Sequence, residues 1–245
     1  MTVLVEVNNI SKSFEAFLAV DDINFSLEKG EVLGFLGPNG AGKTTTMRIL
    51  TGFLKPSSGS IKINGLDLFK NLKKAREFIG YVPEGSPLYN EMTTIDFLSF
   101  ICEIRNIDKG QNLSKIIKLL DLDEVLLQKI DTLSKGFKRR VGLAQALVHD
   151  PKILILDEPT DGLDPNQKHE VRKLIKKLGK EKSIIISTHI LEEVKAICNR
   201  TMILSNGKLL IDDTPTNVLK KSSSYNNLLV SVHDKSAIEL KKELR

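Results

Sequence analysis

Residues 37–44 read Gly-Pro-Asn-Gly-Ala-Gly-Lys-Thr, and this octet restricts the possible folds more than any other part of the chain. Its spacing, a glycine and four further residues before Gly-Lys-Thr, is typical of a loop that wraps the phosphates of a nucleoside triphosphate. Glycines let the backbone N–H groups turn inward around an anion. The apolar stretch 32–36 predicts a strand before the loop, and residues 45–51 predict a helix whose N-terminus attracts an anion. The alternative is a glycine-rich turn that binds nothing, and the agreement of motif and context argues against it.

The loop predicts a nucleoside triphosphate and Mg²⁺ as ligands. Lys43 is expected to reach the β- and γ-phosphates, and the Thr44 hydroxyl to bind Mg²⁺. The residues of the loop that are predicted to bind this nucleotide are Gly37, Pro38, Asn39, Gly40, Ala41, Gly42, Lys43, Thr44 and Thr45.

Two acids follow the apolar run 153–156 and complete the expected phosphate chemistry. A carboxylate at the end of a buried strand is held rigidly at the edge of the sheet. Asp157 is expected to bind Mg²⁺ through water, and Glu158 to orient and deprotonate the attacking water. Either acid alone is explained by a surface position after a strand. Together with the loop at 37–44, they favour a catalytic pair.

The composition is ordinary for a globular protein, with 41% hydrophobic and 27% charged residues among 245. No stretch approaches the roughly 18 consecutive apolar residues of a membrane-spanning helix. The first residues alternate like a strand, so no signal peptide is expected. Cys102 and Cys198 are isolated and suit thiols in a reducing compartment, which predicts a cytoplasmic protein. The net charge of +5 is spread along predicted helices and therefore decides little about partners.

The order of predicted elements indicates an α/β fold. Alternating stretches over 3–36 suit antiparallel strands, whereas the apolar runs 153–156 and 184–186 suit parallel strands covered on both faces. An amphipathic helix over 165–178 connects those two runs, and residues 93–149 read as a helical insertion. Asn64-Gly65 and Asn206-Gly207 predict hairpin turns.

Three further segments make the chain resemble the ATP-hydrolysing subunit of an ATP-binding-cassette (ABC) transporter. Leu133-Ser134-Lys135-Gly136-Phe137 is similar to the family's signature Leu-Ser-Gly-Gly-Gln. Residues 161–164, Asp-Gly-Leu-Asp, resemble its D-loop, and His189 matches its switch histidine. The resemblance implies a P-loop cassette over 1–221 with an antiparallel β-subdomain, a RecA-like mixed sheet core and a helical signature subdomain at about 93–149. Residues 222–245 are expected to form a strand–helix appendage or the start of an accessory module.

The resemblance also implies roles for residues outside the loop. His189 would contact the γ-phosphate as a catalytic residue, and Phe14 would stack on adenine, with core packing as its alternative. Ser134 and Gly136 would bind the ATP held by a second copy of the chain or by a homologous ATPase subunit. Four cations in the first turns after Ser134 oppose the helix dipole, and a bound anion would relieve this repulsion.

The chain departs from the family pattern at three positions. Glu84 stands where relatives have glutamine, and its carboxylate is expected to bind Mg²⁺. Lys135 and Phe137 replace glycine and glutamine of the signature. The combination resembles the drug-export and gliding-motility branch, with a separate integral membrane permease as partner and a position on the inner face of the membrane.

One rival function is that of an ABC protein acting on nucleic acid or ribosomes, although no nucleic acid is expected. The other is a nucleotide binder that does not turn over.

Overall fold

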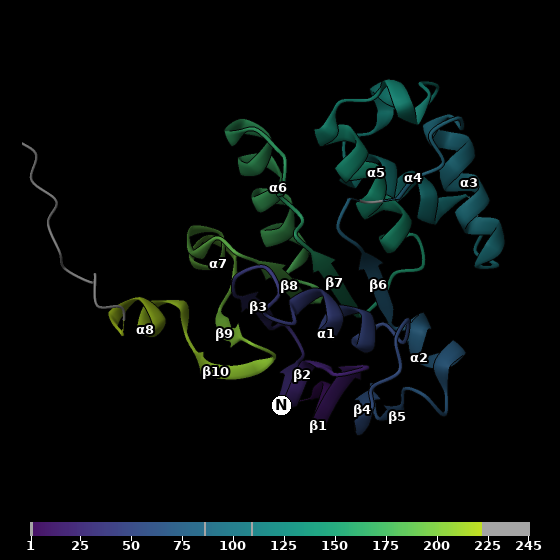
Figure 1. The fold of residues 1–245 in the computed structure, drawn as a ribbon. Helices are drawn as coiled ribbons and strands as arrows, with labels where there is room; N and C mark the ends of the chain where they lie inside the picture. The colour runs from purple at the N-terminus through teal and green to yellow at the C-terminus, as the bar shows by residue number, and fades with distance from the viewer. Residues whose placement is uncertain (1, 86, 109, 222–245) are drawn as a thin grey trace, which may run out of the picture.

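Two β-sheets and a helical layer make up the computed structural model, which describes residues 2–85, 87–108 and 110–221 (Figure 1). The strands are β1 (Val3–Phe14), β2 (Phe17–Glu28), β3 (Val32–Leu36), β4 (Ser58–Ile63), β5 (Leu66–Asp67), β6 (Ile79–Val82), β7 (Ile153–Asp157), β8 (Ser183–Thr188), β9 (Arg200–Ser205) and β10 (Lys208–Asp213). The α-helices are α1 (Lys43–Leu50), α2 (Leu72–Glu77), α3 (Thr94–Ile104), α4 (Gln111–Leu119), α5 (Lys135–Leu147), α6 (Pro165–Leu178), α7 (Leu191–Ile197) and α8 (Pro215–Lys220). The appendage expected at 222–245 lies outside the described residues.

The central sheet has six strands in the order β10-β9-β3-β8-β7-β6. Its members β3, β6, β7, β8 and β9 run parallel, and β10 returns antiparallel after the predicted turn at Asn206-Gly207, so the sheet is mixed as expected. Every residue of β7 and β8 is buried, which explains why both read as continuous apolar runs.

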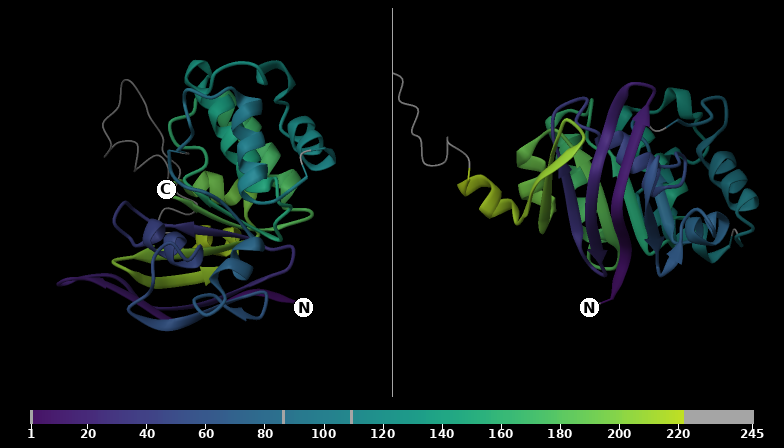
Figure 2. Two further views of the ribbon diagram at one scale, coloured as in Figure 1. Left: turned by 90° about the vertical axis from the view of Figure 1, so that its right-hand side faces the viewer. Right: turned by 60° about the horizontal axis from the view of Figure 1, so that its bottom comes forward.

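Alternate residues of the central strands supply two separate cores. Ile153, Ile155 and Ile185 face α1 and the antiparallel sheet, which has the order β2-β1-β4-β5. Leu154 and Leu156 face the opposite way, toward α3–α6. Figure 2 shows this layering, with α3–α6 and the antiparallel sheet on opposite sides of the central sheet. The period of two along each strand therefore explains the three-layer arrangement.

The helices α3, α4 and α5 lie within residues 93–149, where the sequence predicted a helical insertion. Its helices begin at the residues that the sequence marks: the Thr93 hydroxyl accepts from the Asp96 N–H, and the Ser134 hydroxyl from the Phe137 N–H. Asp164 caps α6 in the same way, with Pro165 in its first turn. No helix among the described residues combines the length and apolar character needed to cross a bilayer.

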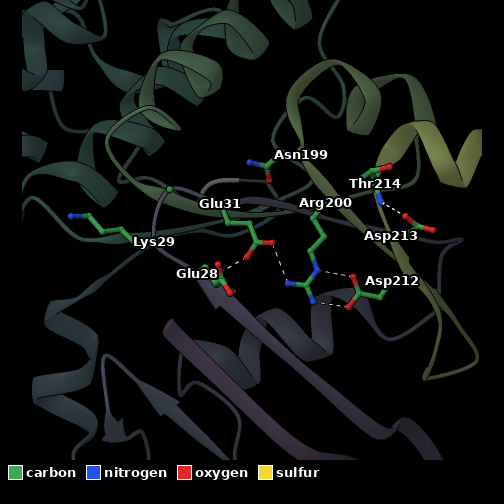
Figure 3. Close-up of a pocket in the computed structure, with 9 residues that line it drawn as sticks. Glu28, Lys29, Glu31, Asn199, Arg200, Asp212, Asp213 and Thr214 are labelled. Atoms are coloured by element: carbon green, nitrogen blue, oxygen red, sulfur yellow. Dashed lines mark hydrogen bonds and ion pairs between the residues drawn. The ribbon is translucent and has the colours of Figure 1, made fainter. Parts of the chain in front are cut away.

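Arg200 connects the β9–β10 hairpin to residues of the first half of the chain (Figure 3). The Arg200 guanidinium donates two bonds of 2.6 Å to the Asp212 carboxylate and one of 3.1 Å to Glu31. A further bond of 2.9 Å reaches the carbonyl of Ser26 in β2. These bonds with Asp212 and Glu31 raise the pKa of Arg200. We refer to Arg200, Asp212 and Glu31 as the arginine cluster.

Candidate active site

The glycine-rich loop joins the carboxyl end of β3 to α1, in contact with strand β2 and with the distant turn at Asn206-Gly207. Gly42 has φ +99°, and an added Cβ would lie 2.6 Å from the carbonyl oxygen of Ala19 and 3.4 Å from Gly207 Cα. The N–H of Gly207 in turn donates to the carbonyl of Ala41 over 3.2 Å. Side chains are therefore excluded where the loop needs its glycines. Helix α1 begins at Lys43 rather than at 45 as predicted, because the left-handed Gly42 serves as its N-cap.

Lys43 points back into the mouth of this loop. Its ammonium donates to the carbonyls of Gly37 and Pro38, at 2.7 and 3.1 Å, and lies 3.6 Å from Glu158 Oε1. The side chain is 6% exposed. A buried cation held by neutral carbonyls at the N-terminus of a helix provides a strong attraction for a phosphate.

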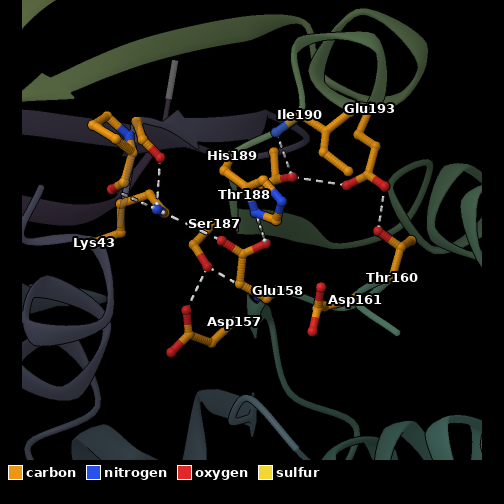
Figure 4. Close-up of polar contacts among 12 residues, drawn as sticks. Lys43, Asp157, Glu158, Thr160, Asp161, Ser187, Thr188, His189, Ile190 and Glu193 are labelled. Carbon is orange, nitrogen blue, oxygen red and sulfur yellow. Dashed lines mark hydrogen bonds and ion pairs between the residues drawn. The ribbon is translucent and has the colours of Figure 1, made fainter. Parts of the chain in front are cut away.

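Asp157 ends β7 and lies close to Ser187 and Glu158 (Figure 4). The hydroxyl of Thr44 donates to Asp157 Oδ1 over 3.3 Å, and the Ser187 hydroxyl donates to the same oxygen. Asp157 is fully buried, yet its Oδ2 has no hydrogen-bond partner among the described residues. Burying an unpaired carboxylate oxygen is costly. The orphaned oxygen, with the Thr44 hydroxyl beside it, fits a hard divalent cation that prefers oxygen ligands.

Glu158 follows directly and has the unusual backbone angle φ +46°. Its N–H donates to the Ser187 hydroxyl over 3.0 Å, and its Oε2 lies 3.1 Å from His189 Nδ1. Burial raises the pKa of Glu158, against the lowering effects of Lys43 and His189. A carboxylate with a raised pKa and an orienting histidine suits a general base.

One cavity of about 380 Å³ unites most of the predicted site. Its lining includes the predicted residues Asn39, Gly40, Ala41, Gly42, Lys43, Thr44, Thr45, Glu84, Glu158 and His189. Gly37 and Pro38 join through their carbonyls, and Asp157 through Thr44. Asp161 and Phe17 also line it, although the sequence did not single them out as site residues.

Phe14 lies outside the lining of this cavity. Its ring lies 5.2 Å from the Lys12 ammonium and borders a neighbouring groove with Arg48 and Phe53. Phe17, three residues along the same hairpin, is the aromatic residue that borders the loop cavity. The hairpin turn between them therefore decides which ring faces the loop.

Ser134 and Gly136 also lie apart from the loop of their own chain, since neither lines the cavity. The predicted repulsion among four cations needs a correction, because three of them have acceptors within the chain. Lys138 donates to the Asp131 carbonyl, Arg139 to the Asp161 carbonyl and Arg140 to the Asp121 carboxylate. No such partner for Lys135 is present in the part of the chain that the structure describes. Charge repulsion alone is therefore a weaker argument for an anion there than the sequence indicated.

Ser187 is the functional residue that sequence reasoning missed. It donates to Asp157 and accepts from the N–H of Glu158, so it orients both acids. The parallel register pairs Asp157 with Ser187 across β7 and β8. A serine near the end of an otherwise apolar strand was the available hint.

Comparison with known proteins agrees with this geometry. The sequence model of the ABC transporter family matches residues 20–161. The chain is 40% identical to the uncharacterized ABC transporter ATP-binding protein YhcH of Bacillus subtilis, covering 86% of this chain and 70% of the relative. It is 36% identical to the bacitracin transport ATP-binding protein BcrA of Bacillus licheniformis, covering 97% and 78% of the two chains.

A solved structure extends the comparison to the fold. The ATP-binding cassette MJ0796, in a dimeric post-hydrolysis state bound to ADP and Pi, superposes with a TM-score of 0.78 at 25% identity, covering 86% of this chain and 99% of that chain. Such an enzyme requires a loop for phosphates, a buried acid with an oxygen to offer a metal ion, and a glutamate held by a histidine. Asp157 meets the second requirement, since its Oδ2 has no hydrogen-bond partner among the described residues. The chain belongs to the ABC transporter family, as an ATP-binding subunit that hydrolyses ATP.

Proposed function

We propose that this subunit binds Mg²⁺–ATP together with a second ATPase subunit and powers a separate integral membrane permease, in the direction of export. The observation that carries the catalytic part is the convergence of Lys43, Glu158 and His189 within one cavity beside the glycine-rich loop. An aromatic residue of the β1–β2 hairpin would contact the adenine, with Phe14 as the residue that the sequence favours.

Three oxygen-bearing side chains would hold the metal ion: Thr44, Asp157 and Glu84. Thr44 and Asp157 are already in contact, and Glu84 lines the same cavity. When bound, Mg²⁺ neutralises charge on the β- and γ-phosphates. The protein's own residues do the rest: Lys43 binds phosphate oxygens, Glu158 accepts the proton of the attacking water, and His189 holds the Glu158 carboxylate in place.

The second subunit would complete the site from outside. Ser134 and Gly136 line no part of the cavity in their own chain, yet Ser134 presents the capped N-terminus of α5. In a head-to-tail pair, that helix end would face the partner's ATP. The dimeric state of the similar MJ0796 cassette supports the pairing of two subunits. The second subunit is either another copy of this chain or a homologous chain.

The permease would dock in a groove of about 620 Å³ between the central sheet and α3. Among the described residues, its lining combines apolar side chains with three arginines and contains no carboxylate: Phe14, Arg48, Thr51, Phe53, Leu54, Arg76, Ile79, Tyr81, Pro83, Pro87, Ile101, Arg105, Gln145 and Ala146. Phe53 is 72% exposed there. Such a surface suits a short permease segment that carries apolar side chains and an acid. This docking would place the subunit on the inner face of the membrane, and export follows the drug-export branch that the sequence resembles.

The test replaces Glu158 with glutamine, which keeps the shape of the side chain and removes its basicity. The Glu158→Gln variant should retain ATP, lose hydrolysis by ~100-fold or more, and sediment as a dimer in Mg²⁺–ATP. Glu170→Gln, an exposed change on α6, is the matched control and should hydrolyse ATP at the wild-type rate. Wild-type hydrolysis by Glu158→Gln would remove Glu158 as the base. An ATP-saturated variant that stays monomeric would contradict the proposed pairing.

A further inference from the structure

Glu193 of α7 is a buried carboxylate that does not line the ATP cavity. It is 2% exposed, and three side chains donate to it, two of which, Thr160 and Thr188, are drawn in Figure 4. The hydroxyl of Thr188 donates to Oε2 over 2.8 Å, while the Thr160 hydroxyl and the Arg172 guanidinium donate to Oε1, the latter over 3.4 Å.

The energetic cost of this arrangement calls for an explanation. Removing a carboxylate from water is energetically costly, and a well-packed apolar side chain of similar size commonly gives an equally stable fold. Stability of the core is thus a poor reason for a glutamate at this place. Its hydrogen bonds do something that an apolar side chain cannot, because they fix the orientation of two hydroxyl groups.

Both hydroxyls belong to segments that border the ATP cavity. Thr188 directly precedes His189, and its oxygen also accepts from the Ile190 N–H over 3.1 Å, so contacts flank His189 on both sides. Thr160 begins the turn that carries Asp161, since its carbonyl accepts from the Leu163 N–H over 3.3 Å. Asp161 lines the cavity, and its own carbonyl accepts from Arg139 of α5.

Glu193 therefore connects two segments that lie far apart in the sequence. On one side lies His189, 3.1 Å from the Glu158 carboxylate. On the other lies the turn at 160–164, which α5 contacts through Arg139. If one of these segments moves, the hydrogen bonds of Glu193 change their geometry. Because Glu193 is bonded to both segments, the movement then affects the second segment as well.

We propose that Glu193 is a positioning residue for ATP hydrolysis, which holds His189 in register with the turn at 160–164 without touching the nucleotide. The proposal rests on the hydrolytic activity assigned above. A positioning residue acts on the rate of the chemical step rather than on binding. Loss of its contacts should lower kcat and leave KM for ATP unchanged.

The experiment combines Glu193→Gln with Thr188→Val, both of which preserve shape. Glu193→Gln should lower kcat by ~10-fold or more, with KM and the Kd for ATP within about twofold of wild type and little change in Tm. Thr188→Val should have a similar effect. The double variant should be no slower than the slower single variant, because both changes break one contact.

Thr201→Val is the matched control, since the buried Thr201 hydroxyl in β9 has no hydrogen-bond partner among the described residues. It should leave kcat unchanged. A kcat of Glu193→Gln within twofold of wild type would overturn the proposal, as would multiplicative effects in the double variant. A loss of rate that follows the unfolded fraction would reduce Glu193 to a structural role. A wild-type protein without ATP hydrolysis would instead contradict the enzymatic assignment itself.

Discussion

Two polar clusters of this molecule hold carboxylates at the ends of central strands, and they differ in how completely these are paired. In the arginine cluster, both oxygens of Asp212 and of Glu31 accept hydrogen bonds. In the second cluster, Asp157 keeps one buried oxygen without a described partner, and Glu158 has a left-handed backbone.

The difference distinguishes a structural cluster from a ligand site. Paired charges hold the β9–β10 hairpin against the turn between β2 and β3 and leave nothing for a ligand to add. The incomplete pairing around Asp157 costs stability in the free protein, and a bound Mg²⁺–ATP would supply the missing partners. Substitutions in the arginine cluster should therefore lower the stability of the fold, whereas substitutions around Asp157 should affect ATP binding and hydrolysis.

Lys43→Ala should have the largest effect and should act on ligand binding. Loss of charge-assisted bonds to phosphate predicts that the affinity for ATP falls by ~100-fold. The free energy of unfolding without ATP should change little, because the contacts of the ammonium within the described residues are two loop carbonyls and Glu158. Isothermal titration calorimetry and urea unfolding measure the two quantities. Unchanged ATP affinity would contradict the assignment of the loop.

Asp157→Asn should lower the rate of ATP hydrolysis without lowering the stability of the fold. Removing a buried charge with an unpaired oxygen should leave Tm unchanged or raise it, while hydrolysis falls by ~100-fold. Chelation of Mg²⁺ by EDTA should lower the hydrolysis rate of the wild type to that of the Asp157→Asn variant. A variant that loses stability and retains hydrolysis would reverse the comparison between the clusters.

Arg200→Ala should show the opposite behaviour. The two carboxylates lose their shared donor, which predicts a decrease of ~2 kcal/mol in the free energy of unfolding. The folded fraction should keep the wild-type KM and kcat for ATP, as measured well below Tm. A selective loss of ATP affinity at unchanged stability would show that the arginine cluster belongs to the ligand site.

Alanine substitutions of Phe14 and Phe17 should have the smallest effect and define the outer limit of the ligand site. Stacking on a base is worth ~1 kcal/mol, so the residue that contacts adenine should cost about fivefold in ATP affinity. The sequence assigns this role to Phe14, and its substitution is expected to show the loss. A loss found only for Phe17→Ala would transfer the role to the ring that borders the cavity.

Local patterns predicted much of this fold. Helix α6 occupies the predicted residues 165–178, because Asp164, Pro165 and the apolar spacing all act within a few residues. The strands β7 and β8 follow from their unbroken apolar runs, and the hairpins from Asn64-Gly65 and Asn206-Gly207. The loop at 37–44 follows β3 and leads into α1, and Asp157 and Glu158 lie at the end of β7, where the same local patterns predicted them. Their roles in the reaction stay predictions.

Long-range contacts escaped prediction. The roles of Ser187 and Glu193 depend on the register of β8 against β7 and on the packing of α7, neither of which a short sequence window contains. The partners of Lys138, Arg139 and Arg140 likewise come from other segments, which is why the charge pattern alone misled. The direction of Phe14 and Phe17 depends on the turn at Glu15, where φ is +50°.

The contact of Gly207 with Ala41 and Ala19 has a consequence for synthesis on the ribosome. Translation supplies the triphosphate loop early, but the turn that supports it is made more than 160 residues later. A nascent chain that stops short of this turn carries every ATP motif and still lacks the support beneath Ala41. Competence to bind ATP should therefore arise late in translation, and shortened fragments that retain all the motifs should bind poorly.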